Sequence, residues 1–182
     1  ATYDRERGAA ADENILNSTR ATDFIAPASS GERRLRDAAL ALAATAPFAR
    51  RLVNSGRLSV PTTYDTPLST PDADPWAGAA RLGAPVPDAP LLRPDGTPTH
   101  LTALVAGRFM LLCTGEGPSG LRGADVVVVG RDLLDGEGLF AQRFYATHGA
   151  CFLLRPDGHL TARWRSFDRV KVEDAIRRAK GF

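Results

Sequence analysis

Residues 145–165, YATHGACFLLRPDGHLTARWR, constrain the fold more than any other stretch of this sequence. They predict two short strands, 151–154 and 159–164, joined by a turn at 156–158. An Asp-Gly step between apolar runs is a strong hairpin signal, because glycine adopts a positive φ without a Cβ clash. Helical patterns precede and follow this hairpin, so we expect it to supply the last two strands of a small α/β sheet.

The two predicted strands carry different patterns. The first is apolar throughout, which is typical of a strand that is covered on both faces. In the second, Leu160, Ala162 and Trp164 alternate with Thr161 and Arg163. This alternation predicts a strand with one face in the core and the other face in water.

Composition narrows the function classes. A formal net charge of +2 on 182 residues is too small to indicate nucleic-acid binding. No apolar run reaches the roughly 18 residues that span a bilayer, and the polar N-terminus lacks a signal-peptide core. Two cysteines far apart in the sequence do not make a disulfide framework, so a reducing cytoplasm is the expected compartment.

The first 90 residues predict helices followed by a linker. Residues 1–58 read as a helical segment, with a capping box at Ser29 and Glu32 and with thin apolar faces that need a partner. Residues 59–90 hold seven of the 13 prolines, which favours an extended linker that crosses a surface. The chain starts at Ala1 directly in a helical pattern, so we expect a fragment of a longer protein.

Residues 91–182 predict a mixed sheet. Strands expected at 109–113 and 126–129 precede a helix at 137–145, then the hairpin, then a final helix capped by Asp168. The first two strands run parallel and the hairpin antiparallel, with helices on the faces of the sheet. This order resembles the thioredoxin fold. We therefore expect an α/β, thioredoxin-like mixed sheet with flanking helices, preceded by the N-terminal helical segment.

The residues that carry thioredoxin chemistry are missing from their expected places. In thioredoxins a CxxC motif follows the strand that corresponds to 109–113, whereas this chain has Cys113 followed by Thr-Gly-Glu-Gly. Ala150 stands where the cis-proline of thioredoxins would be, eight residues before Gly158. A lone cysteine cannot form the local disulfide that this chemistry needs, so we expect a domain without redox activity.

A second resemblance covers nearly the whole chain. Its motifs resemble the C-terminal region of FAD-dependent aromatic hydroxylases of the phenol hydroxylase and 3-(3-hydroxyphenyl)propionate hydroxylase type. Gly8 departs from that family, which usually has proline there. The most specific motif is the last of the four, which are YDRER at 3–7, NSTR at 17–20, PFARRLVNSGRLS at 47–59 and RPDGHLTARW at 155–164.

This resemblance implies a parent enzyme that reduces FAD with NAD(P)H and hydroxylates a phenolic ring. The G-x-G-x-x-G turn and the Gly-Asp motif that hold FAD in that family are not in this sequence, and Gly115-x-Gly117 does not open an apolar helix. We therefore expect no cofactor-binding residues here, and a missing N-terminal FAD domain as the partner. In such enzymes this region is an appendage at the dimer interface, so we expect a homo-oligomer without nucleic acid or membrane partners.

Few other residues suggest chemistry. Both Cys113 and Cys151 are favoured as buried core residues, with Cys113 the candidate for a reactive thiol. His100, His148 and His159 stand too far apart for a metal site. The acidic residues around the Gly at 136 lack the register of a calcium loop, and the arginines near the C-terminus favour a solvated, paired face. We expect no metal ligands.

Three functions follow from these features. The first is a non-catalytic C-terminal accessory and assembly fragment, contributing to dimerisation, of a flavin-dependent aromatic-ring monooxygenase. In it, 1–58 would be the edge of the flavin domain, 59–90 the linker and 91–182 the thioredoxin-like domain. The alternative is a thiol-dependent, thioredoxin-like or peroxiredoxin-like protein that uses Cys113. The third is an adaptor that binds a partner through the linker.

Overall fold

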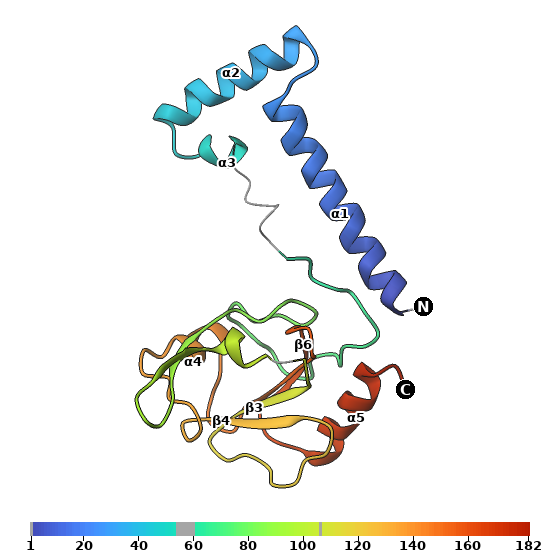
Figure 1. The fold of residues 1–182 in the computed structure, drawn as a ribbon, viewed down its shortest axis with the longest axis vertical. Coiled ribbons are helices and arrows are strands. Elements are labelled where there is room, and N and C mark those ends of the chain that lie inside the picture. The colour runs from blue at the N-terminus through green and yellow to red at the C-terminus, as the bar shows by residue number, and fades with distance from the viewer. Residues whose placement is uncertain (1, 54–60, 106) are drawn as a thin grey trace. The chain divides into compact units, whose positions relative to one another are not determined.

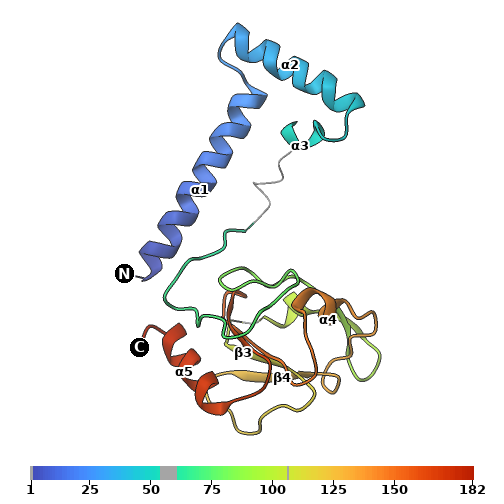
Figure 2. The ribbon, with the colours of Figure 1, turned by 180° about the vertical axis from the view of Figure 1, so that it is seen from behind.

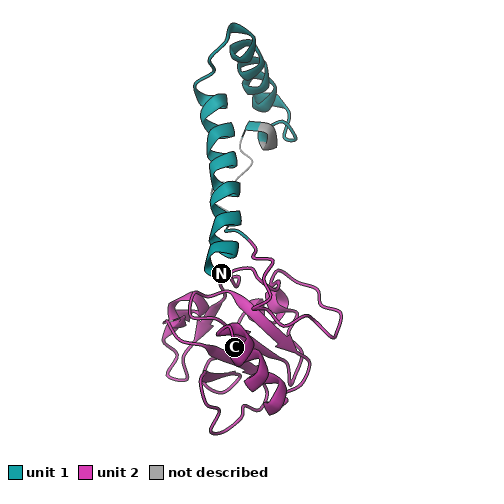
Figure 3. Cartoon of the chain, turned by 90° about the vertical axis from the view of Figure 1, so that its right-hand side faces the viewer, with its two compact units in different colours: residues 1, 3–62 teal, residues 2, 63–182 magenta. Residues whose placement is uncertain are grey.

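Contacts within the chain divide it into two compact units, residues 3–62 and residues 63–182 (Figure 3). The computed structural model describes residues 2–53, 61–105 and 107–182. The expected boundary between residues 58 and 59 lies outside the described residues, and the three-part division of the chain stays a prediction. Most of the Pro-rich stretch nevertheless belongs to the second unit.

The first unit is helical, as the sequence predicts. Its helices are α1 (Thr2–Ile25), α2 (Ser30–Thr45) and α3 (Arg50–Val53). The predicted capping box opens α2: the Ser29 hydroxyl accepts a hydrogen bond from the Glu32 amide at 3.2 Å, and the Glu32 carboxylate accepts one from the Ser29 amide at 2.9 Å. These two bonds satisfy donors that a helix end leaves unpaired.

The apolar faces of this unit lie open to water. Ile15 of α1 is 64% exposed and Leu35 of α2 is 72% exposed, and none of the described residues of α2 is buried. In proteins, most of the stability of a helix comes from packing of its apolar face, and here those faces are left in water. In the part of the chain that the structure describes, no helix combines the length and the apolarity that crossing a membrane requires.

Four strands form the central sheet of the second unit, in the order β4-β3-β5-β6 (Figure 1). The β3–β4 pair is parallel, whereas β3–β5 and β5–β6 are antiparallel. This arrangement confirms the predicted mixed α/β sheet. The strands are β3 (Met110–Thr114), β4 (Asp125–Val129), β5 (Cys151–Leu154) and β6 (Leu160–Trp164).

One face of the sheet packs against α5 (Arg169–Ala179), seen from both sides in Figures 1 and 2. The Asp168 carboxylate accepts hydrogen bonds from the amides of Val170 and Lys171, so it caps α5 as predicted. The buried residues of α5 are the four that the sequence pattern indicates: Val172, Ala175, Ile176 and Ala179.

A second core covers the other face of the sheet. The ring of Phe152 in β5 makes edge contacts with Phe144 at 5.1 Å, Trp76 at 5.5 Å and Phe140 at 6.1 Å between centroids. Such edge-to-face contacts are favourable beyond the area that they bury. This core includes residues of β1 (Pro90–Leu92), the 3-10 helix η2 (Leu101–Leu104) and α4 (Leu139–Phe144), and β2 (Pro98–His100) pairs with β1.

Candidate functional site

The RPDGHLTARW motif occupies the β5–β6 turn and β6, and residues 63–83 pack along it. We name residues 63–83 the strap. The two ends of the strap meet, because the Tyr64 amide donates to the Gly83 oxygen and the Gly83 amide donates to the Leu160 oxygen, each at 2.8 Å. Gly83 has φ +72°, and a Cβ there would lie 2.0 Å from the Tyr64 oxygen, so glycine is required.

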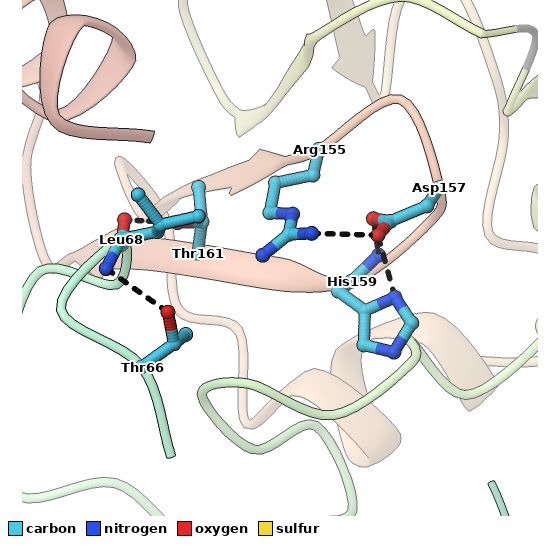
Figure 4. Close-up of polar contacts among 6 residues, drawn as sticks. All are labelled: Thr66, Leu68, Arg155, Asp157, His159 and Thr161. Atoms are coloured by element: carbon cyan, nitrogen blue, oxygen red, sulfur yellow. Dashed lines mark hydrogen bonds and ion pairs between the residues drawn. The ribbon is translucent and has the colours of Figure 1, made fainter. Parts of the chain in front are cut away.

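The turn before β6 holds the first end of the strap. The rings of Tyr64 and His159 stack with 4.5 Å between centroids, and the Arg155 guanidinium lies 5.8 Å from the Tyr64 ring. Asp157 joins this group: its carboxylate accepts from Arg155 Nη2 at 2.8 Å and lies 3.2 Å from His159 Nδ1 (Figure 4). The latter pair is in ion-pair range without hydrogen-bond alignment.

The neighbours of Asp157 determine the charge state of its carboxyl group. Partial burial alone would raise the pKa of Asp157. The close contact and charge of the His159 ring, the charge of Arg155 and the hydrogen bond from the His159 amide outweigh burial and lower the pKa of Asp157 to about 2. Asp157 is therefore an anion at neutral pH, held between two groups of the same turn.

β6 contacts the middle of the strap. The Thr161 hydroxyl donates to the Leu68 oxygen at 2.9 Å (Figure 4). The Thr70 amide donates to the Thr161 oxygen at 2.8 Å. The Thr66 hydroxyl accepts from the Leu68 amide at 3.2 Å. Thr161 is fully buried. The prediction that this face of the strand lies in water is wrong, because the strap takes the place of water on it.

Two arginines hold the far part of the strap. Arg163 donates through Nε and Nη2 to the two carboxylate oxygens of Asp72, at 2.9 and 2.6 Å, and its side chain is only 8% exposed. The Arg165 Nη2 donates to the Pro75 oxygen at 2.7 Å. The ring of Trp76 contacts both guanidinium groups, with the Cζ atoms of Arg163 and Arg165 at 4.9 and 3.6 Å from its centroid.

The strap also bounds a hollow of about 350 Å³. Its lining offers hydroxyl groups, one carboxylate and apolar surface, but no cysteine, histidine or lysine: Thr63, Tyr64, Asp65, Thr66, Ser69, Pro71 and Leu82. Across the described residues, no group of three or more metal-ligating side chains comes together. The motif and the strap therefore form a structural joint, in which Arg155 pairs with Asp157 and Arg163 pairs with Asp72.

The two cysteines meet at the opposite face of the sheet. Cys113 of β3 and Cys151 of β5 stand opposite each other in the antiparallel register, with their Sγ atoms 3.5 Å apart, and both are fully buried. The Cys151 thiol donates to the Cys113 sulfur, which lowers the pKa of Cys113 against the effect of burial, with help from the charge of Arg131. The pKa of Cys151 is raised, because its thiol donates this hydrogen bond, because it is buried, and because the charge on Cys113 is close to it.

Comparison with solved structures places this fold. Aklavinone-11 hydroxylase in complex with FAD and aklavinone matches with a TM-score of 0.70 and 18% identity, over 100% of this chain and 35% of its own. OxyS anhydrotetracycline hydroxylase from Streptomyces rimosus has a TM-score of 0.61 and 24% identity, over 97% of this chain and 34% of its own. The chain has the fold of one third of these hydroxylases.

A third flavin enzyme extends the comparison. The rebeccamycin biosynthetic enzyme RebC, solved with reduced flavin, matches with a TM-score of 0.61 and 21% identity, over 98% of this chain and 36% of its own. The chain therefore spans about a third of the length of these three enzymes. No family model matches the sequence, and no curated protein matches it either.

Other residues singled out in the sequence make local contacts within the second unit. His100 pairs with Asp88 at 2.8 Å, and the ring of His148 packs against Gly115. Asp135, one of the acidic residues near Gly136, accepts hydrogen bonds from two amides of the first turn of α4. The site that sequence reasoning missed is the joint of strap and β6, whose partners lie about 90 residues apart in the chain.

Proposed function

We propose that this chain is the C-terminal part of a flavin-dependent aromatic-ring monooxygenase and acts in it as a non-catalytic accessory and assembly module. The match that carries the proposal is the one to aklavinone-11 hydroxylase, solved with FAD, which extends over all of this chain but only 35% of the hydroxylase. The parent enzyme would bind FAD and NAD(P)H through its other two thirds.

The use of the RPDGHLTARW motif supports a structural role. Its polar side chains bind the strap or one another: Arg163 pairs with Asp72, Thr161 with Leu68, and Asp157 with its own turn. A motif whose charged groups are paired inside the domain has none left over to bind a substrate or a cofactor. The module would therefore contribute shape and contact.

The exposed faces of α1 and α2 support an assembly role. Leu35 and Leu42 of α2 and Ile15 of α1 are large apolar side chains open to water. In the proposed enzyme these helices, within residues 1–58, form the edge of the FAD domain, and residues 91–182 are the thioredoxin-like appendage at a dimer interface. The partners are thus the FAD domain and a second copy of the enzyme.

The test has two arms. The purified chain is incubated with FAD and passed through a desalting column, and the flavin absorbance of the protein fraction is measured. We expect no stoichiometric flavin. The open reading frame upstream of this sequence is then expressed together with it; we expect bound FAD and substrate-dependent NAD(P)H oxidation. Tight, stoichiometric FAD binding by the chain alone would overturn the proposal.

The position of Cys151 favours a second candidate function, a thiol-dependent activity of Cys113 of the thioredoxin or peroxiredoxin kind. Its sulfur lies 3.5 Å from that of Cys113, and this contact lowers the pKa of Cys113. Both sulfurs are fully buried, which closes them to a protein disulfide substrate. Turnover of peroxide with dithiothreitol as the electron donor tests this candidate, and equal rates for Cys113→Ser and the unaltered chain would remove it.

A further inference from the structure

The cysteine pair has the geometry that a cross-strand disulfide needs. Residues opposite each other in an antiparallel pair alternate between hydrogen-bonded and non-hydrogen-bonded positions. The Thr114 amide donates to the Ala150 oxygen, so the neighbouring pair, Cys113 and Cys151, takes the non-hydrogen-bonded position. There the Cα atoms lie about 4.5 Å apart, within the range that disulfides span.

Both side chains point the same way. Cys113 and Cys151 belong to one core cluster, on the face of the sheet that α5 covers, and their Sγ atoms are already in contact at 3.5 Å. Closing this contact to the S–S bond length of about 2.0 Å needs side-chain rotation and no exchange of strand partners.

The environment assigns different roles to the two sulfurs. Cys113 accepts the hydrogen bond and lies near the positive charge of Arg131, so it is the sulfur on which a negative charge is stabilised. Cys151 keeps its proton, which it directs at Cys113 or at the Gly149 oxygen. Cys113 is thus the nucleophile, and Cys151 is the thiol that resolves the product.

We propose that Cys113 and Cys151 form an intrachain disulfide, that the oxidant is hydrogen peroxide or a comparably small hydroperoxide, and that a small dithiol reverses the oxidation by thiol–disulfide exchange. The Cys113 thiolate attacks one peroxide oxygen, the O–O bond breaks, and hydroxide leaves and takes up a proton. Cys151 then attacks the sulfenic acid: the S–S bond forms, the S–O bond breaks, and water leaves with the Cys151 proton. Overall, two thiols and one hydrogen peroxide give one disulfide and two waters.

Burial decides which oxidants can react. Neither sulfur is exposed, so a folded disulfide protein cannot align with them. Both cysteines nevertheless stand near strand ends: Cys113 is the penultimate residue of β3, and Cys151 is the first residue of β5, directly after Gly149–Ala150. Local opening of strand ends costs less than global unfolding. Small reagents can therefore reach the two sulfurs through such openings, whereas a folded protein cannot.

The experiment uses the full chain, reduced and then treated with a small molar excess of hydrogen peroxide in native buffer. We expect the loss of both free thiols, an intact mass lower by two hydrogen atoms, and one tryptic cross-link between the peptides that contain Cys113 and Cys151. Dithiothreitol should restore both thiols. Two thiols that survive the treatment, or oxidation that yields only sulfinic acid or links between chains, would overturn the proposal.

Single-cysteine variants test the order of the two sulfurs. In Cys151→Ser, peroxide followed by dimedone should label Cys113, because its sulfenic acid has no resolving thiol. In Cys113→Ser, dimedone labelling of Cys151 should be at least tenfold slower. Equal labelling of the two variants would contradict the assigned roles. The measurement needs neither flavin nor the parent enzyme, so its outcome is independent of the proposed function.

Discussion

At the scale of single residues, this chain contains the same four-residue turn twice. Arg-Pro-Asp-Gly occurs at 93–96 and 155–158, and in both turns the aspartate accepts a hydrogen bond from the amide two residues ahead. The glycines have φ of +84° and +80°. Their surroundings differ, since Asp95 lies in solvent whereas Asp157 sits between Arg155 and His159.

This pair predicts unequal effects for one substitution. Asp157→Asn should lower the free energy of unfolding by about 1 kcal/mol at neutral pH, a figure discounted for the partial exposure of the carboxylate. Asp95→Asn, the matched control, should change it less, because its charge faces water. Urea unfolding followed by circular dichroism measures both variants, and equal losses would show that the Arg155–His159 environment contributes nothing.

The same carboxylate predicts a pH dependence. Its folded pKa, about 2, lies below the value of about 3.9 expected in the unfolded chain. The stabilisation is therefore complete above pH ~4 and is lost as the pH falls toward 2. Unfolding midpoints measured between neutral and acidic pH should fall less steeply for Asp157→Asn than for the unaltered chain; parallel curves would contradict the assignment.

Gly83 supplies a second residue-scale prediction. Gly83→Ala should destabilise the chain by about 2 kcal/mol or more, because it adds a steric clash with the Tyr64 oxygen to the strain of a positive φ. Gly96→Ala is the control, since its φ is also positive but nothing lies within 4 Å of its Cβ position. The difference between their urea midpoints isolates the contact; if the two losses match, the closure of the strap does not depend on glycine.

At the scale of elements, β6 shows which structural features its local sequence predicts and which it does not. The pattern of Leu160, Ala162 and Trp164 predicts the strand, which is confirmed, and a single core face. All three residues are buried, but Ala162 and Trp164 lie in the core under α5, whereas Leu160, beyond a β-bulge, lies in the other core. The opposite face is also covered, which no local pattern can reveal. Thr161 and Arg163 look like solvated residues until a segment about 90 positions earlier supplies their partners.

Strand register explains the other element that sequence reasoning missed. The strands around Cys113 and Cys151 were both predicted and were placed in one sheet. Whether the cysteines face each other depends on which residues pair between β3 and β5, and an offset of one residue turns a side chain to the other face. The apolar runs around both cysteines lack the alternation that would fix this offset, so the sulfur contact could not be read in advance.

The buried Arg163–Asp72 ion pair between β6 and the strap should contribute more to the free energy of unfolding than an exposed ion pair does. Arg163→Ala should cost about 2 kcal/mol or more, because it leaves the Asp72 carboxylate without its two-point partner. Arg163→Lys should restore only part of this loss, since lysine cannot bind both carboxylate oxygens in a plane. Arg177→Ala, which removes an exposed pair with Asp174, is the control and should cost under about 0.5 kcal/mol. Equal losses at Arg163 and Arg177 would contradict this account.

At the scale of the whole molecule, the two units differ in how they are stabilised. The second unit has cores on both faces of its sheet, with Phe152 and Leu153 fully buried on opposite sides. The described part of the first unit leaves its largest apolar side chains in water. Such helices gain most of their stability from packing against something else.

This imbalance predicts self-association of the isolated chain. Sedimentation velocity at micromolar concentrations should show dimers or larger species, and Leu35→Glu combined with Leu42→Glu should shift the distribution toward monomer. Val170→Glu, which places the same charge on an exposed apolar residue of the second unit, is the control and should have no such effect. A strictly monomeric unaltered chain would contradict the prediction.

Because the two ends of the strap are held against β6 and the turn before it, the protein should tolerate cleavage of the backbone within the strap. A protease cut near residue 74 would divide the strap between two polypeptides. Tyr64 and Asp72 would lie on the N-terminal piece, and their partners His159 and Arg163 would lie on the C-terminal piece, which also contains the whole four-stranded sheet. The Tyr64–His159 stack and the Asp72–Arg163 ion pair would thus join the two pieces. The two pieces should therefore stay together after nicking, and fragments made separately should reassemble when they are mixed.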